Sequence, residues 1–136
     1  MYIALEQPTG AHLLTDHNEV AVPVTLRHTS DDPSAVHLAF PAWISLDEEE
    51  VTWTVTRSLL SEGLTAPASR GTVRIRPHGP THTVVELHTP QGIAAVRFTT
   101  ADLHRFLTRC YEVTESEGEP TESAHALGRA SLFGAA

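Results

Sequence analysis

The sequence predicts an α+β fold in which antiparallel strands and two helices are arranged as two successive strand-then-helix halves. Three observations support this prediction. Several short segments alternate apolar and polar residues, which is the period of a half-buried strand. Two segments carry helix-type apolar patterns, one ending near Gly63 and the other near Tyr111. Proline, glycine and aspartate residues separate the segments, as is typical of turns between strands.

Length and composition limit which classes of protein the chain can belong to. The chain has 136 residues, 40% of them hydrophobic, which suits one domain with its own core. No apolar run approaches the ~18 residues that cross a membrane, and no basic segment precedes an apolar one at the N-terminus. We therefore expect a cytoplasmic protein without membrane insertion. The single cysteine, Cys110, excludes an intrachain disulfide and a cysteine-based zinc site.

Net charge bears on the kind of partner. The chain carries a net charge of −8, and all nine of its basic residues are arginine. A protein that binds nucleic acid must neutralise phosphates, and its usual footprint is a basic surface. The acidic balance therefore argues against nucleic acid as a partner.

The first half of the chain contains alternating segments at residues 11–15, 20–26 and 36–40. The second of these carries the cleanest pattern, yet it contains Pro23. Because proline has no N–H to donate to a strand ladder, we expect this strand to lie at a sheet edge or to carry a bulge.

Residues 51–77 read as a strand, one helical turn, a loop and a second strand. Val51, Trp53 and Val55 alternate with threonines, so we expect Trp53 in the core rather than in a ligand site. Gly63 follows the helical turn, and we expect it to hold a positive φ as the residue that ends the helix.

The second half repeats this order. Residues 83–88 and 93–98 flank Thr89-Pro90-Gln91-Gly92, which is a hairpin turn signal. A helix with Thr99 as its N-cap follows, and its apolar stripe is Leu103, Phe106, Leu107 and Cys110. We expect one domain over residues 1–111, followed by an acidic loop and a short C-terminal helix within residues 112–136 that belong to the same domain.

Sequence motifs of catalysis and cofactor binding are absent. The chain has no Gly-rich phosphate loop, no G-x-S-x-G and no H-E-x-x-H. Three histidines, His78, His82 and His88, lie near one another in sequence, either as ordinary surface residues or as ligands of a zinc ion. The pattern favours surface residues, because no acidic ligand is interleaved among them at a recurring spacing. We therefore expect no enzyme, no cofactor and no metal.

Two segments are candidate interaction surfaces. The linker of residues 41–50 carries Trp43, Ile44 and Leu46, which form either an exposed apolar patch or an extra turn folded onto the body. Three arginines, Arg57, Arg74 and Arg76, form either a basic strip for an acidic peptide or neighbouring subunit, or a solvated face paired with Glu62 or Glu86.

Four ordered blocks within residues 20–111 resemble the SsgA-like proteins, which control sporulation and cell division in actinobacteria. The central block is W-x-x-x-R-x-L-L-x-E-G-L followed by P-x-x-x-G-x-V-R-I-x-P, from Trp53 to Pro77. The other blocks lie at residues 24–40, 89–94 and 103–109. About a dozen matching positions in the central block make this far more specific than a short motif.

The resemblance implies a strongly bent antiparallel sheet with packed helices, similar to the whirly-type fold. It implies a non-enzymatic adaptor that helps to place the tubulin-like protein FtsZ and septal wall synthesis at sporulation septa. It also implies a homotrimer, with FtsZ or another SsgA-like protein as partner, and recruitment to the division septum. The alternative is a single-stranded nucleic-acid-binding protein, by analogy with the whirly-type fold alone.

Overall fold

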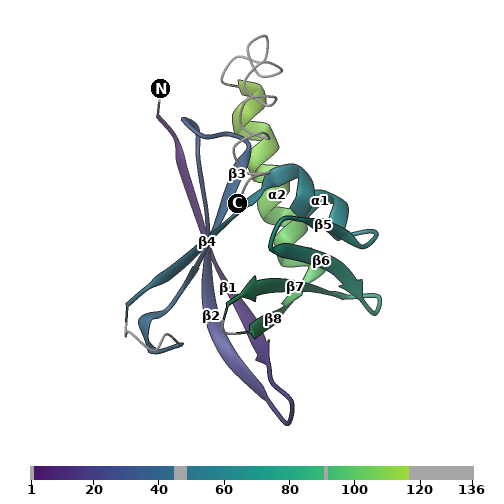
Figure 1. The fold of residues 1–136 in the computed structure, drawn as a ribbon. Helices are drawn as coiled ribbons and strands as arrows, with labels where there is room; N and C mark the ends of the chain where they lie inside the picture. Colours follow the sequence, from purple (N-terminus) through teal and green to yellow (C-terminus); the bar gives the residue numbers. More distant parts are fainter. Residues whose placement is uncertain (1, 45–48, 91, 117–136) are drawn as a thin grey trace.

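An eight-stranded antiparallel sheet carries two helices in the computed structural model, which describes residues 2–44, 49–90 and 92–116 (Figure 1). The sheet is strongly bent, and the predicted α+β class is confirmed. The elements in chain order are β1 (Ala4–Leu14), β2 (Glu19–Thr29), β3 (Ala35–Phe40), the 3-10 turn η1 (Ala42–Ile44), β4 (Val51–Thr56), α1 (Arg57–Gly63), β5 (Ala68–Arg70), β6 (Val73–His78), β7 (His82–Thr89), β8 (Gly92–Thr99) and α2 (Thr100–Ser116).

The strand order is β4-β3-β2-β1-β8-β7-β6-β5. Each half of the chain is therefore a meander of four strands followed by a helix. The order of strands and then a helix agrees with the sequence prediction, whereas β5 lies where a loop was expected. The two meanders join through antiparallel pairing of β1 with β8, from Ala11 opposite Phe98 to Leu14 opposite Ala95. This join leaves β4 and β5 as the two edges of the sheet.

The inner face of the bent sheet is apolar across its width and forms the core. The register places Leu38 opposite both Leu26 and Trp53, so alternate residues of neighbouring strands share this face. The predicted stripe of α2 packs against it, and α1 adds Leu59 and Leu60. The buried cluster comprises Ala11, Val22, Val24, Leu26, Val36, Leu38, Phe40, Val55, Leu59, Leu60, Val73, Ile75, Val85, Leu87, Val96, Phe98, Leu103, Phe106, Leu107 and Cys110.

The prediction that the strand with Pro23 lies at a sheet edge or carries a bulge is wrong, although Pro23 itself lies where the strand has a neighbour on one side only. β2 lies inside the sheet, and its register with β1 runs without a bulge from Glu19 to Thr29. β3, however, pairs with β2 only between Thr25 and Arg27. Around Pro23 the strand therefore has only β1 beside it, where a missing N–H costs no ladder bond.

α2 is longer than the sequence indicates. The predicted acidic loop begins at residue 112, but the helix continues to Ser116. The first strand is also longer than expected, because β1 begins at Ala4. The predicted C-terminal helix at residues 124–133 lies outside the described residues.

The prediction that Gly63 caps α1 with a positive φ is wrong. Gly63 is the last residue of α1, and positive φ values occur at Gly71, Gly79 and Gly92 instead. Glycine is needed at this position for space. A Cβ there would lie 2.2 Å from Cγ2 of Ile75, because α1 packs its last turn directly on β6.

Replacement of Gly63 by alanine should therefore destabilise the fold. The clash with Ile75 forces the helix away from β6, and overpacking of this kind costs about 1–3 kcal/mol. Urea denaturation measures the change. Gly10→Ala is the matched control, since a Cβ at Gly10 meets nothing within 4 Å. Equal midpoints for wild type and Gly63→Ala would contradict the close approach.

His28 is a buried polar residue among the apolar core. It is 0% exposed, and its Nε2 lies 3.1 Å from the carbonyl oxygen of Pro33. Its Nδ1 has no hydrogen-bond partner. Burial, with a smaller contribution from Arg57, lowers the pKa of His28 below its usual value. The fold therefore holds this imidazole neutral.

The depressed pKa predicts a loss of stability in mild acid. Below pH ~6.5 the unfolded chain binds a proton at this histidine while the folded chain does not, so stability falls by up to about 1.4 kcal/mol per pH unit until the folded pKa is reached. Thermal unfolding between pH 7.5 and 5 measures the slope. His28→Gln should flatten it, whereas His17→Gln, an exposed control in the β1–β2 loop, should not. An unchanged slope in His28→Gln would assign the pH dependence to other groups.

Candidate interaction site

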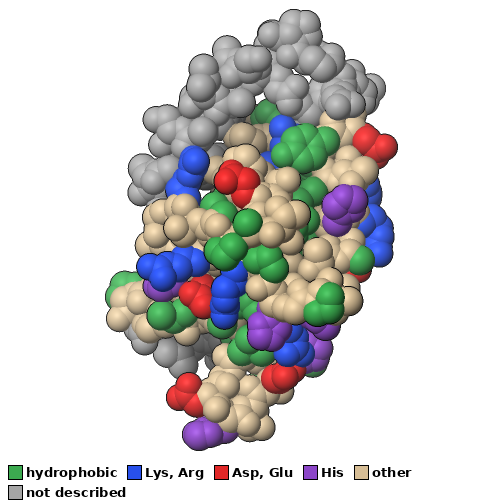
Figure 2. All heavy atoms as spheres, turned by 90° about the vertical axis from the view of Figure 1, so that its right-hand side faces the viewer, with side chains coloured by type: hydrophobic (Ala, Val, Ile, Leu, Met, Phe, Trp, Pro, Cys, Tyr) green, Lys and Arg blue, Asp and Glu red, His purple; other side chains and the backbone are tan. Residues whose placement is uncertain are grey.

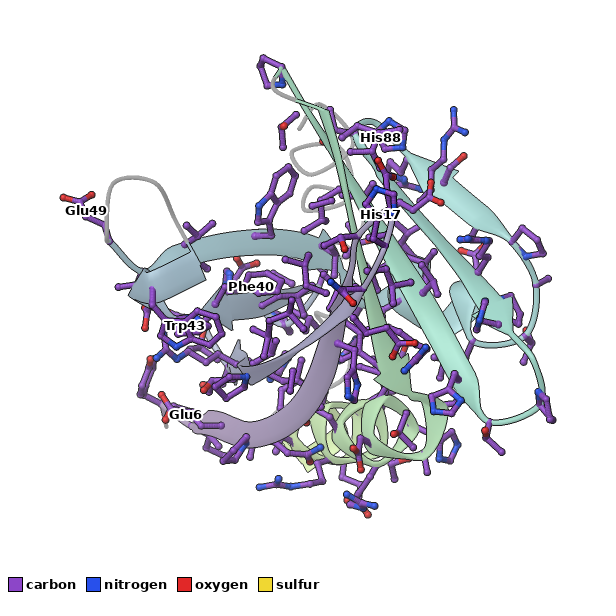
Figure 3. All side chains as sticks on the ribbon, turned by 90° about the horizontal axis from the view of Figure 1, so that it is seen from below. Glu6, His17, Phe40, Trp43, Glu49 and His88 are labelled. Carbon is purple, nitrogen blue, oxygen red and sulfur yellow. The ribbon has the colours of Figure 1, made fainter. Side chains whose placement is uncertain are left out.

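The linker of residues 41–50 begins with an extra turn, η1, that leaves Trp43 exposed. Trp43 lies on η1 and is 60% exposed. Figure 3 shows Trp43 and Glu49 on the side of the molecule formed by the first meander, well away from His88, whereas Phe40 points into the interior. Leu46 lies outside the described residues. Of the three side chains in the predicted patch, the structure describes that of Trp43.

The three candidate arginines do not form one strip. Arg57 is 8% exposed, and its guanidinium carbon lies 4.0 Å from the ring centroid of Tyr111. This cation–π contact connects α1 to α2. The sequence placed Arg57 with Arg74 and Arg76 on a basic strip or a solvated face, but the packing of α2 against α1 buries it.

Arg74 and Arg76 lie on the outer face of β6, as predicted. Arg76 pairs with Glu86 at 3.1 Å, while Arg74 is exposed. Glu86 also lies 3.5 Å from Nε2 of His88. Figure 2 shows arginine and histidine side chains interspersed with acidic ones on the face it displays, instead of a continuous basic patch. The ion pair with Glu86 that the sequence left open for these arginines is therefore present at Arg76.

A second ion pair lies on the outer face where the two meanders join. Arg97 of β8 donates to both carboxylate oxygens of Glu19 on β2, one of them at 3.1 Å. The hydrogen bonds from Arg97 lower the pKa of Glu19. Like the pair on β6, this arrangement neutralises charge within the chain.

A groove beside the edge strand β4 is the feature that sequence reasoning missed. It has a volume of about 320 Å³ and lies between β4 and the β5–β6 hairpin. Its lining includes Trp53 and Leu59 on one side and Arg70 and Val73 on the other. The bend of the sheet brings its two edges toward each other and creates this groove, which no local pattern encodes.

Trp53 also borders a second hollow on the inner face. This hollow has a volume of about 130 Å³ and is lined by Leu13, Phe40, Val51, Trp53, Leu87, Ala94 and Val96. Trp53 is partly buried and packs against the core, as the sequence predicts, but it is not enclosed. Its indole therefore separates two hollows at the open side of the bent sheet.

Truncation of Trp53 should cost less than truncation of an enclosed tryptophan. Full burial gives a range of about 3–5 kcal/mol for Trp→Ala, and the open surroundings of Trp53 reduce the expected loss to about 2–3 kcal/mol. Chemical denaturation measures it. Phe106→Ala, at a 0% exposed position on α2, should cost more and serves as the reference. A Trp53 value equal to that of Phe106 would contradict the open position.

Two observations bear on metal binding and on the single thiol. Within residues 2–44, 49–90 and 92–116, no three His, Cys, Asp or Glu side chains gather as a metal site. Burial raises the pKa of the Cys110 thiol to about 12. Because the thiolate is the reactive form, Cys110 is a packing residue of α2 and not a nucleophile.

The fold and site together define an α+β protein built on a bent antiparallel sheet, whose candidate site comprises an exposed tryptophan and a groove beside an edge strand. A family model described as "Streptomyces sporulation and cell division protein, SsgA" matches residues 22–119. The chain belongs to this SsgA family of sporulation and cell division proteins, which confirms the resemblance seen in the four sequence blocks.

Similar sequences come from several actinobacteria. The chain is 39% identical over 94 residues to a sporulation-specific cell division protein of Frankia casuarinae, covering 67% of this chain and 62% of that protein. It is 36% identical over 93 residues to SsgB of Kineococcus radiotolerans (65% and 54%) and 35% identical over 100 residues to SsgB of Streptomyces coelicolor (71% and 71%). The matches therefore span less than two thirds of the length of the first two relatives.

Solved structures share the fold. A crystal structure of an SsgA-like sporulation-specific cell division protein from Thermobifida fusca superposes with a TM-score of 0.74 and 29% identity, covering 97% of this chain and 93% of that one. A structure described under "Mutations in SsgB correlate to longitudinal cell division during sporulation of Streptomyces coelicolor" gives 0.72 and 30%, covering 83% and 88%. Among the described residues, no helix is long and apolar enough to span a membrane.

Proposed function

We propose that this protein is a non-enzymatic adaptor that helps to recruit or position the division machinery, FtsZ or septal wall synthesis, at division septa. The observation that carries the proposal is the family match over residues 22–119, together with a fold shared with sporulation-specific cell division proteins. An adaptor needs binding surfaces and no catalytic cluster. An exposed Trp43 and a groove at a sheet edge fit that requirement.

Association with FtsZ tests the adaptor role. Purified protein should co-sediment with polymerised FtsZ of the same host, and a fluorescent fusion should gather at septa before constriction. Trp43→Ser should weaken co-sedimentation if the linker of residues 41–50 contacts FtsZ. Ile93→Ser is the matched control, because Ile93 is 62% exposed but lies on the other meander. No association with FtsZ and a diffuse fusion in dividing cells would refute this function.

The adaptor is proposed to act as a homotrimer. The edge strand β5 and the exposed Trp43 on η1 offer backbone and apolar surface for self-association. Light scattering of the purified protein should give about three times the chain mass of 14.8 kDa at micromolar concentrations. Replacement of Trp43 and Ile44 by serine should reduce the mass without unfolding the subunit. A mass of one chain for the wild type would exclude the trimer.

Nucleic-acid binding is the other class of function for a whirly-like fold. The net charge of −8 and the internally paired arginines on the outer face oppose it. Titration with labelled single-stranded DNA at low salt decides between the classes. Weak binding agrees with the adaptor, whereas tight binding that falls steeply with added salt would replace it.

A further inference from the structure

We propose that the free edge of β4 is a docking site for an extended, basic-ended peptide of a partner protein, which pairs with β4 as an additional strand. This inference rests on the adaptor function and gives it a mode of binding. Its test measures peptide binding alone, without FtsZ or septa. A failure of the docking site is therefore distinguishable from a failure of the adaptor role.

Among the described residues, no strand pairs with β4 on the side that faces away from β3. The amide of Arg57 donates to the carbonyl of Ser34 at 2.7 Å, in register with the β3–β4 ladder. In an antiparallel ladder, residues alternate between bonding to one neighbour and bonding to the other. Val51, Trp53 and Val55 thus direct their N–H and C=O groups toward β3. Thr52 and Thr54 direct theirs toward the free edge.

The edge lacks the usual protection against pairing. Natural edge strands are shortened, or carry proline or charge, because an open row of N–H and C=O groups attracts other strands. β5, the opposite edge, has three residues and ends in Arg70. β4 has six residues, V-T-W-T-V-T, with neither proline nor charge, and each residue has a high strand propensity. An unprotected edge of this length is suited to strand addition.

The groove gives the added strand side-chain contacts. The wall opposite β4, formed by Thr72 and Val73, leaves a space of about 320 Å³ beside the unpaired edge. An incoming strand that pairs with Thr52 and Thr54 would direct alternate side chains toward Trp53 and Leu59. Those side chains must be apolar to match this lining, whereas the intervening ones face solvent and are unrestricted.

Negative charge at the beginning of β4 favours a peptide whose C-terminal end is basic. Glu49 is exposed, and the side chain of Glu50 is 54% exposed despite its ion pair with Arg27. Both directly precede Val51. An antiparallel partner strand ends beside this point, so lysine or arginine after its apolar residues would meet the two carboxylates. The net charge of −8 adds a general attraction for such a peptide.

A synthetic probe tests the site on the full chain. The probe is an N-acetylated, fluorescein-labelled peptide of three Thr-Val repeats followed by two arginines, and its binding is followed by fluorescence anisotropy. Thr52→Pro removes one N–H from the free edge and leaves the ladder to β3 intact, so affinity should fall about tenfold or more. Thr52→Ala, which keeps the N–H, should stay within about twofold of the wild type. Equal binding by Thr52→Pro would overturn the proposal.

Modified peptides provide an independent arm if Thr52→Pro does not fold. N-methylation of alternate peptide amides blocks pairing only when the methylated set faces β4. One set should abolish binding, and the other should leave it within a few-fold. Equal effects of the two sets would exclude strand addition.

Hydrogen exchange locates the contact and separates the alternatives. In the free protein, the amides of Thr52 and Thr54 should exchange faster than those of Trp53 and Val55. Saturating peptide should slow Thr52 and Thr54 selectively. If these amides are already protected in concentrated free protein and the peptide does not bind, a second copy occupies the edge, and the proposal of a partner peptide is wrong.

A charge variant tests the orientation of the peptide. Glu49→Gln should weaken binding several-fold and reduce its dependence on salt. Asp16→Asn, in the exposed β1–β2 loop, should change neither. A peptide with its two arginines at the N-terminal end should bind more weakly than the original probe. Equal affinity for both peptides would overturn the assigned direction and charge.

Discussion

The pairing of β1 with β8 is the interaction on which the rest of the structure depends. Within each meander, strands that are consecutive in the sequence pair with each other. The pairing of β1 with β8 connects the two meanders into one sheet. β1 serves both, since it pairs with β2 over its whole length and with β8 near its end. This join creates the continuous inner face on which α2 lies. The side-chain amide of Gln7 on β1 donates to the carbonyl of Asp102 at 3.0 Å, which attaches α2 to the first meander.

The two helices are packed closely enough to restrict the residues between them. Gly63 allows the last turn of α1 to lie on Ile75, and no other residue could do so without displacing the helix. Arg57 is held against Tyr111, and its charge adds to the lowering of the His28 pKa. Arg57 and Gly63 are the first and last residues of α1, so this short helix contacts α2 at its beginning and β6 at its end. A displacement of α1 from β6 would therefore also disturb the contact between Arg57 of α1 and Tyr111 of α2.

The helices do not cover the whole inner face. α1 and α2 close one side of the bent sheet, as Figure 1 shows, while Trp53 marks a side where the sheet edges approach each other without pairing. A half-closed sheet retains an edge strand, and an edge strand retains unpaired backbone groups. Within the described residues, the shape of the fold thus places an edge strand beside a groove. This feature agrees with the proposed role as an adaptor among sporulation and cell division proteins.

Much of the local structure followed from the sequence alone. Alternation in residues 20–26, 36–40 and 51–56 predicted strands that the structure contains, and the stripe from Leu103 to Cys110 predicted α2. These features depend on side chains a few residues apart, which periodicity reports directly. The spacing of the central block, from Trp53 to Pro77, was specific enough to indicate the family, and the family match confirms it.

Tertiary structure decided the rest. The sequence gives no order for the eight strands, so Pro23 was assigned to an edge strand although β2 lies inside the sheet. Gly63 was interpreted as a cap because a glycine after a helical turn usually is one, but its role depends on Ile75, twelve residues away. Arg57 is buried by a residue from the other half of the chain. The groove beside β4 arises only when the sheet bends. Each of these features depends on which distant elements become neighbours, and local periodicity carries no information about that.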